Sequence, residues 1–212
     1  MRVQWIKIDN CLGFSSIQLP LNYAGVTPIS GPNGSGKSNI LLALQMALCG
    51  KMGCRWPDRP LTEGAQEGTI TVRTIECDAL MEPEYLDFHL WFEDRGDGSC
   101  RHRFDILDST SEPCPEPRKT MRQLRDTTDL EIQQPFDRHL MSHSKAILLG
   151  KESIEPRELR TYICSNASFL DEEGQLELEE WAHNHDLQIV AEIHGKGFSV
   201  SSNHIALHEV LV

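Results

Sequence analysis

The stretch GPNGSGKSN limits what this chain can fold into more than any other part of its sequence. It fits the pattern G-x-x-x-x-G-K-[ST], in which glycines let successive backbone N–H groups turn inward onto phosphate oxygens. Lys37 is expected to reach the β- and γ-phosphates of a nucleotide, and the Ser38 hydroxyl is expected to ligate Mg²⁺. The predicted phosphate-binding residues are Gly31, Pro32, Asn33, Gly34, Ser35, Gly36, Lys37, Ser38 and Asn39.

The residues on either side have the pattern that such a loop requires, a strand before it and a helix after it. The apolar stretch GVTPIS ends at Ser30, and the apolar residues of NILLALQMALCG follow helical spacing as far as Gly50, which suits a C-terminal stop. The N-terminus of this helix adds its dipole to the anion site. Two earlier strands are expected at 3–8 and 16–21, where apolar and polar residues alternate.

The order strand, strand, strand, loop, helix differs from that of small nucleoside kinases, in which the loop usually follows the first strand. With IKIDNCLGF followed by GPNGSGKSNILLALQMAL, the chain resembles the head domains of the SMC, RecF and SbcC superfamily of ABC-type DNA-repair ATPases. The resemblance implies an α/β fold, an ABC-type P-loop ATPase head that binds ATP and Mg²⁺. A small P-loop kinase is a less favoured alternative, because the sequence has no recognisable Arg-rich lid.

The middle of the chain is expected to form a mixed or antiparallel sheet around the loop helix. Residues 69–74 alternate as a strand, and 85–94 and 101–107 alternate around the turn-rich DRGDGS, which favours an antiparallel hairpin. A short helix is expected at 120–130.

The C-terminal third is interpreted through the same resemblance. Ser142–Lys145 occupies the place of the ABC signature, which opens a helix, and 159–164 occupies the place of the Walker B strand. ASFLD resembles the D-loop, with Asp171 in its Asp position, and an amphipathic helix at 174–186 and a last strand at 186–193 follow.

The signature place predicts a second anion site. The Ser142 and Ser144 hydroxyls and helix N-terminal N–H groups would meet the γ-phosphate held by the loop of a second subunit, which implies an ATP-dependent homodimer. The alternative for Ser142 is an ordinary helix N-cap.

The resemblance divides a single head, 1–212, into an N-terminal lobe at 1–131, a linker at 132–141 and a C-terminal lobe at 142–212. Relatives carry a long coiled coil between the lobes, whereas this linker contains no heptads. Either the natural protein has no rod, or the chain is a shortened head.

The strand end at the Walker B place departs from the family pattern. That strand normally ends in Asp-Glu, of which the Asp holds Mg²⁺ through water and the Glu polarises the attacking water. This chain has Ser165 and Asn166 there. Each candidate to supply the missing chemistry has the alternative of being an ordinary solvated polar residue. The candidates are Asn166, Asp171 and Glu192 as catalytic residues, Glu172 and Glu173 as nearby carboxylates, His194 as a switch, and Gln133 or Gln134 as the Q-loop residue, with Gln134 a metal ligand beside Ser38.

The net charge of -12 and the pI near 5.1 argue against a protein that coats nucleic acid by itself. DNA contact would need a local basic patch, for which the alternative is a solvated helix face. The two candidate patches are Lys51, Arg55 and Arg59, and Arg118, Lys119, Arg122 and Arg125.

The seven cysteines are scattered, and no CxxC occurs, which favours reduced thiols over a zinc site. No apolar run is long enough to span a bilayer, and the N-terminus has no secretory pattern. A cytoplasmic or nucleoid-associated location is therefore expected.

Two functions remain open at this point. The first is an ATPase head that dimerises on ATP and works in DNA repair or recombination. The second is a nucleotide-gated scaffold that hydrolyses little and holds a partner such as a nuclease.

Overall fold

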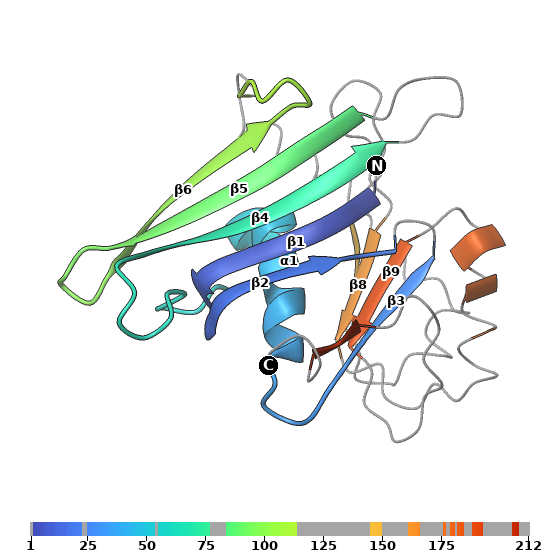
Figure 1. Cartoon of the computed structure of the whole chain (residues 1–212), viewed down its shortest axis with the longest axis horizontal. Coiled ribbons are helices and arrows are strands. Elements are labelled where there is room, and N and C mark those ends of the chain that lie inside the picture. Colours follow the sequence, from blue (N-terminus) through green and yellow to red (C-terminus); the bar gives the residue numbers. More distant parts are fainter. Residues whose placement is uncertain are drawn as a thin grey trace.

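The computed structural model describes residues 2–22, 25–53, 55–76, 84–113, 145–149, 161–165, 176, 179–180, 182–184, 188–192 and 205–207. These residues form two sheets and one long helix (Figure 1). The elements are β1 (Arg2–Cys11), β2 (Phe14–Pro20), β3 (Val26–Ser30), α1 (Lys37–Gly53), β4 (Glu67–Glu76), β5 (Glu84–Asp94), β6 (Cys100–Leu107), β7 (Lys145–Leu149), β8 (Thr161–Ser165), β9 (Gln188–Glu192) and β10 (Ile205–Ala206).

The first sheet has the order β2-β1-β4-β5-β6, and every neighbouring pair is antiparallel. Alternate residues of its strands, such as Ile8, Ile70 and Phe88, are fully buried on one face, as the alternating sequence predicts. The hairpin expected around DRGDGS is confirmed, because β5 and β6 pair from Asp94↔Cys100 onward.

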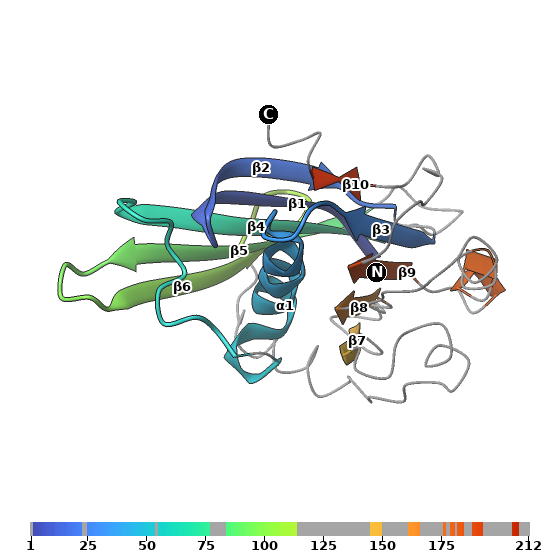
Figure 2. The ribbon, with the colours of Figure 1, turned by 90° about the horizontal axis from the view of Figure 1, so that it is seen from below.

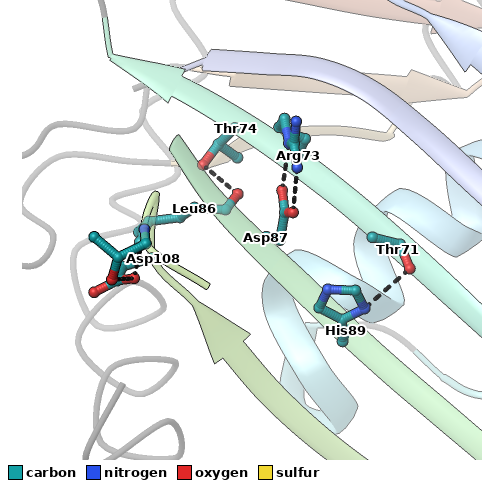
Figure 3. Close-up of polar contacts among 8 residues, drawn as sticks. Thr71, Arg73, Thr74, Leu86, Asp87, His89 and Asp108 are labelled. Carbon is teal, nitrogen blue, oxygen red and sulfur yellow. Dashed lines mark hydrogen bonds and ion pairs between the residues drawn. The ribbon is translucent and has the colours of Figure 1, made fainter. Parts of the chain in front are cut away.

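The opposite face of this sheet is fixed by cross-strand pairs (Figure 3). Arg73 on β4 donates two hydrogen bonds to the Asp87 carboxylate on β5, at 2.7 and 2.6 Å, and its guanidinium lies over the ring of Trp5 on β1. Two residues further along each strand, the Thr71 Oγ1 and His89 Nδ1 atoms are 3.2 Å apart. Such pairs stabilise one register of neighbouring strands over the others.

The second sheet has the order β10-β3-β9-β8-β7. Strands β10, β3, β9 and β8 are parallel, and β7 pairs antiparallel with β8. The strand before the loop, β3, therefore lies between two strands from the far end of the sequence, with Ile29 opposite Glu192 and Ser30 opposite Ala206. The carboxyl ends of these parallel strands meet at the edge where the loop begins, which is where ligands bind in such sheets.

Helix α1 lies between the two sheets (Figure 2) and contacts β4 and β5 of one and β8 and β9 of the other. The five residues predicted from helical spacing, Ile40, Leu41, Leu44, Ala47 and Leu48, are buried. Ala43 and Met46, on other sides of the helix, are also fully buried. A helix that is covered on both sides is apolar nearly all round, so one core joins both sheets.

The predicted helix stop at Gly50 is wrong, because α1 continues to Gly53. A glycine inside a helix costs only about 1 kcal/mol relative to alanine, and packing on both sides offsets that cost.

The helix expected at the signature place is also wrong over the described residues. Lys145–Leu149 forms β7 instead, paired with β8 at Ile147↔Ile163. The run KAILL is short and apolar, and periodicity alone does not separate a buried strand from a helix at that length. Ser142 and Ser144 lie outside the described residues.

The other C-terminal elements agree with the sequence. The strands expected at 159–164 and 186–193 are present as β8 and β9. Residues 176, 179–180 and 182–184 are helical, and Ala182 is buried while Glu180, His183 and Asn184 are exposed, as expected for an amphipathic helix. Leu176 departs from this pattern, because it is 66% exposed. The helix expected at 120–130 lies outside the described residues. Among the described helices, none has the length and apolar character needed to cross a membrane.

Candidate functional site

The loop between β3 and α1 takes a shape that side chains would obstruct. Gly34 and Gly36 have φ angles of 82° and 91°, in the left-handed region that glycine adopts at low cost. A Cβ at Gly36 would lie 2.5 Å from the ring of Phe14, and a Cβ at Gly31 would lie 2.8 Å from Ser35 Oγ. Gly31 and Gly36 therefore let the backbone lie closer to neighbouring groups than a side chain would allow.

The first turn of α1 closes on the loop. The N–H groups of Asn39 and Ile40 donate to the Gly36 carbonyl, at 2.9 and 3.1 Å. The Asn39 side-chain amide donates to the Leu12 carbonyl at 2.7 Å, which ties the loop to the turn between β1 and β2. The amides at the start of a helix have no intrahelical acceptor, so this end of α1 attracts anions.

Lys37 is held inside the loop. Its ammonium donates to the carbonyls of Gly31 and Pro32, at 2.9 and 3.0 Å, and the residue is 4% exposed. A buried ammonium needs acceptors to replace its water, and the loop's own carbonyls supply them.

Ser38 is joined to the other end of the chain. Its hydroxyl donates to Glu192 Oε2 at 2.6 Å. Glu192 is the last residue of β9 and is 2% exposed. The parallel pairing of β9 with β3 carries this carboxylate to the loop.

These groups surround a pocket of about 340 Å³ at the N-terminus of α1. It is lined by Asn33, Gly34, Gly36, Lys37, Ser38, Asn39 and Glu192. The pocket thus brings together six of the nine predicted loop residues and adds one of the three catalytic candidates, Glu192.

The other predicted residues that the structure describes do not line this pocket. Ser165 ends β8. Arg55 and Arg59 are exposed. The others lie outside the described residues or have no described side chain: Asn166, Asp171, Glu172, Glu173, His194, Gln133, Gln134, Lys51, Arg118, Lys119, Arg122 and Arg125.

Sequence reasoning missed two residues that shape the loop. The Phe14 ring fills the space beside Gly36, and the Leu12 carbonyl receives Asn39. Both belong to the segment CLGF, which was used only as part of the family-like stretch IKIDNCLGF and not for its contacts with the loop. The left-handed φ of 54° at Leu12 cannot be anticipated from a leucine.

The pocket fits the phosphates of a nucleotide and their Mg²⁺. The Ser35 hydroxyl is buried and has no hydrogen-bond partner among the described residues, and it belongs to the same loop. An anion would supply the acceptor that a buried hydroxyl needs. Lys37, the helix amides and the Ser35 hydroxyl form a donor set typical of a phosphate site, and Glu192 with Ser38 offers the oxygen ligands that Mg²⁺ prefers.

Solved structures with a similar chain path include two SMC heads and a recombination mediator protein. The SMC head domain from Thermotoga maritima has 15% identity, covers 92% of this chain and 90% of its own length, and has a TM-score of 0.48. An SMC head bound to the C-winged helix domain of ScpA has 16% identity and a TM-score of 0.41, over 59% of this chain and 39% of that one. The recombination mediator RecF with ATP has 17% identity and a TM-score of 0.39, over 53% of this chain and 27% of that one. The chain thus spans less than two thirds of the last two proteins.

A family model gives the wider match. The model of the AAA domain family AAA_23 matches residues 6–181, which run from β1 through the loop and α1 to the helical residues before β9. This range covers most of the chain and includes the phosphate-binding loop. The P-loop ATPase fold predicted from the sequence is therefore confirmed, and the chain belongs to the AAA_23 family of AAA domains.

Proposed function

We propose that this chain is an ATP-binding head that forms a homodimer on ATP, hydrolyses ATP slowly and serves DNA repair or recombination. The observation that carries the proposal is the pocket at the N-terminus of α1, where Lys37, Ser38 and Glu192 meet. The resemblance to SMC, RecF and SbcC heads supports the link to DNA.

The chain's own residues divide the work of binding. The loop and helix amides and the Lys37 ammonium would hold the phosphates, and Ser38 would hold the Mg²⁺. The nucleotide supplies the phosphoanhydride bond to be broken, and the metal ion neutralises charge on its phosphates.

Slow hydrolysis follows from the end of β8. This strand lies beside β9, and Ser165 is its last residue, at a place where the family pattern has a carboxylate. The next residue, Asn166, stands where the pattern has the Glu that polarises water, and an amide does not accept a proton at neutral pH, so water activation would be inefficient.

The same feature favours a second candidate function. A head that binds ATP tightly but rarely hydrolyses it can act as a nucleotide-gated scaffold for a partner such as a nuclease. ATP would then stabilise one assembly state, by its differential affinity for that state.

Calorimetric titration with ATP and Mg²⁺, followed by light scattering of the same samples, tests the proposal. We expect saturable binding and a doubling of mass with ATP. Absence of binding heat at millimolar ATP would contradict the nucleotide site. Binding of ATP without a change of mass would support the nucleotide site but contradict the proposed dimer. Steady-state phosphate release then separates the ATPase head from the scaffold.

A further inference from the structure

Glu192 is a buried carboxylate in the wall of the phosphate pocket. It is 2% exposed, lies at the end of β9, and accepts a hydrogen bond from Ser38 at 2.6 Å. Lys37 lines the same pocket, with its ammonium on the Gly31 and Pro32 carbonyls. The Glu192 carboxylate therefore lines the same pocket in which the negatively charged phosphates of a nucleotide would bind.

Electrostatics makes this arrangement selective. A carboxylate and a phosphate in one partly buried pocket repel each other, more strongly than they would in water. A divalent cation between the carboxylate and the phosphate turns this net repulsion into attraction, because the cation attracts both groups. Glu192 should thus disfavour nucleotide without metal and favour nucleotide with metal.

The direction of the Ser38 hydrogen bond agrees with this role. Because its hydroxyl proton is given to Glu192, the oxygen lone pairs remain for a metal ion. Carboxylates commonly orient metal ligands through such hydrogen bonds. The contact spans 154 residues of sequence and is made where β9 runs beside β3.

The neighbouring strand lacks the usual acid. β8 ends in Ser165, whereas β9, which lies between β8 and β3, ends in Glu192. We propose that Glu192 is the acidic positioning residue of the Mg²⁺ site and that it makes nucleotide binding depend on the divalent ion. In this arrangement the acid comes from β9, next to β3, and not from β8. This inference rests on the nucleotide binding proposed above.

The test compares the Kd for ATP in excess Mg²⁺ with the Kd in EDTA, by calorimetry. Wild type should bind at least about 10- to 100-fold more tightly with Mg²⁺. Glu192→Gln should weaken binding of ATP with Mg²⁺ and strengthen binding of ATP in EDTA, because the repulsion is gone. Glu192→Asp keeps the charge and should keep the preference for Mg²⁺. Glu180→Gln, at an exposed helical position, is the matched control and should behave as wild type.

A second readout does not depend on catalysis. Electron paramagnetic resonance with Mn²⁺ and ADP should show protein-bound Mn²⁺ in wild type, and about 10- to 100-fold weaker Mn²⁺ binding in Glu192→Gln. A merely structural role would lower the melting temperature without changing the ratio of the two Kd values.

The outcomes separate the two proposals. No ATP binding by wild type in either condition contradicts the proposed function itself. ATP binding by wild type that is equal with Mg²⁺ and with EDTA overturns the role of Glu192 alone, and it needs no variant. A folded Glu192→Gln protein with an unchanged ratio of Kd values also overturns it.

Discussion

Lys37 shows how one residue prepares the pocket before any ligand arrives. Its ammonium exchanges water for the carbonyls of Gly31 and Pro32, so the loop backbone already surrounds the lysine's positive charge. Phosphate oxygens offer the same ammonium an ionised acceptor, so that both partners of the hydrogen bond carry charge and attract each other directly. The exchange of carbonyl for phosphate therefore favours binding.

Lys37→Ala should abolish stabilisation by ATP with Mg²⁺. For wild type at a ligand concentration of about 100 times Kd, linkage gives about 2.7 kcal/mol of added stability, and the melting temperature should rise accordingly. Lys7→Ala is the control, because Lys7 lies on the outer face of β1, paired with Asp9 and 43% exposed. A thermal shift that survives in Lys37→Ala would show that ATP binds elsewhere.

His89 gives the fold a pH dependence of its own. Burial lowers its pKa, although the charges of Asp87 and Asp105 act in the opposite direction. The unfolded chain then binds more protons than the folded one, so stability falls as the pH drops below the usual histidine value of about 6.5. The urea concentration at the unfolding midpoint should fall between neutral and mildly acidic pH, and this decrease should be smaller in His89→Gln than in wild type. An identical decrease in both proteins would assign the dependence to other groups.

At the scale of elements, the ends of β8 and β9 decide what the pocket can do. They lie side by side in the parallel sheet, yet one ends in Ser165 and the other in Glu192. Phosphoryl transfer needs charge neutralisation and a positioned water. In the arrangement proposed here, Glu192 serves the first need through the Mg²⁺ that it helps to hold, and the end of β8 leaves the second need unfilled.

Asn166→Glu should therefore raise turnover without improving affinity. Wild type is expected to hydrolyse ATP well below the ~1 s⁻¹ of slow ordinary enzymes, and a positioned base typically contributes about 10²- to 10⁴-fold. Asn184→Glu, at an exposed helical position, controls for the added charge. Brisk turnover by wild type that is unchanged in Asn166→Glu and lost in Glu192→Gln would instead make Glu192 the base.

Local patterns were sufficient for most elements of this fold. The strands of the first sheet alternate, and α1 follows the loop motif, so both were predictable from neighbouring residues. The contact of Ser38 with Glu192 was not, because it depends on which strand pairs with β3. The sequence named Glu192 through family resemblance, without its partner. The segment KAILL was misassigned, because tertiary pairing with β8 decides between strand and helix.

At the scale of the whole molecule, the net charge of -12 opposes any contact with nucleic acid. The cations Arg118, Lys119, Arg122 and Arg125 are the candidate exception, on a segment outside the described residues. Binding through them alone would be electrostatic and strongly dependent on salt.

If these four cations neutralise four phosphates, log Kd measured on duplex DNA should change with log salt with a slope magnitude of about 3.6. Arg122→Ala should reduce that magnitude by about 0.9 and weaken binding to all sequences alike. Arg55→Ala, at an exposed position elsewhere, is the comparison. A slope near zero would remove DNA as a direct partner.

The position of β3 between β9 and β10 has a consequence for how the protein is made. Strands β1, β2, β4, β5 and β6 lie within residues 2–107, so their sheet can pair early on the ribosome. β3 must wait for strands that are translated more than 150 residues later, and at about 5–20 residues per second this delay lasts on the order of ten seconds. During that interval the loop lacks Glu192 and both flanking strands. We therefore expect nascent chains that end before β9 to expose the apolar β3 and α1 and to require chaperones, and nucleotide to stabilise only the completed chain.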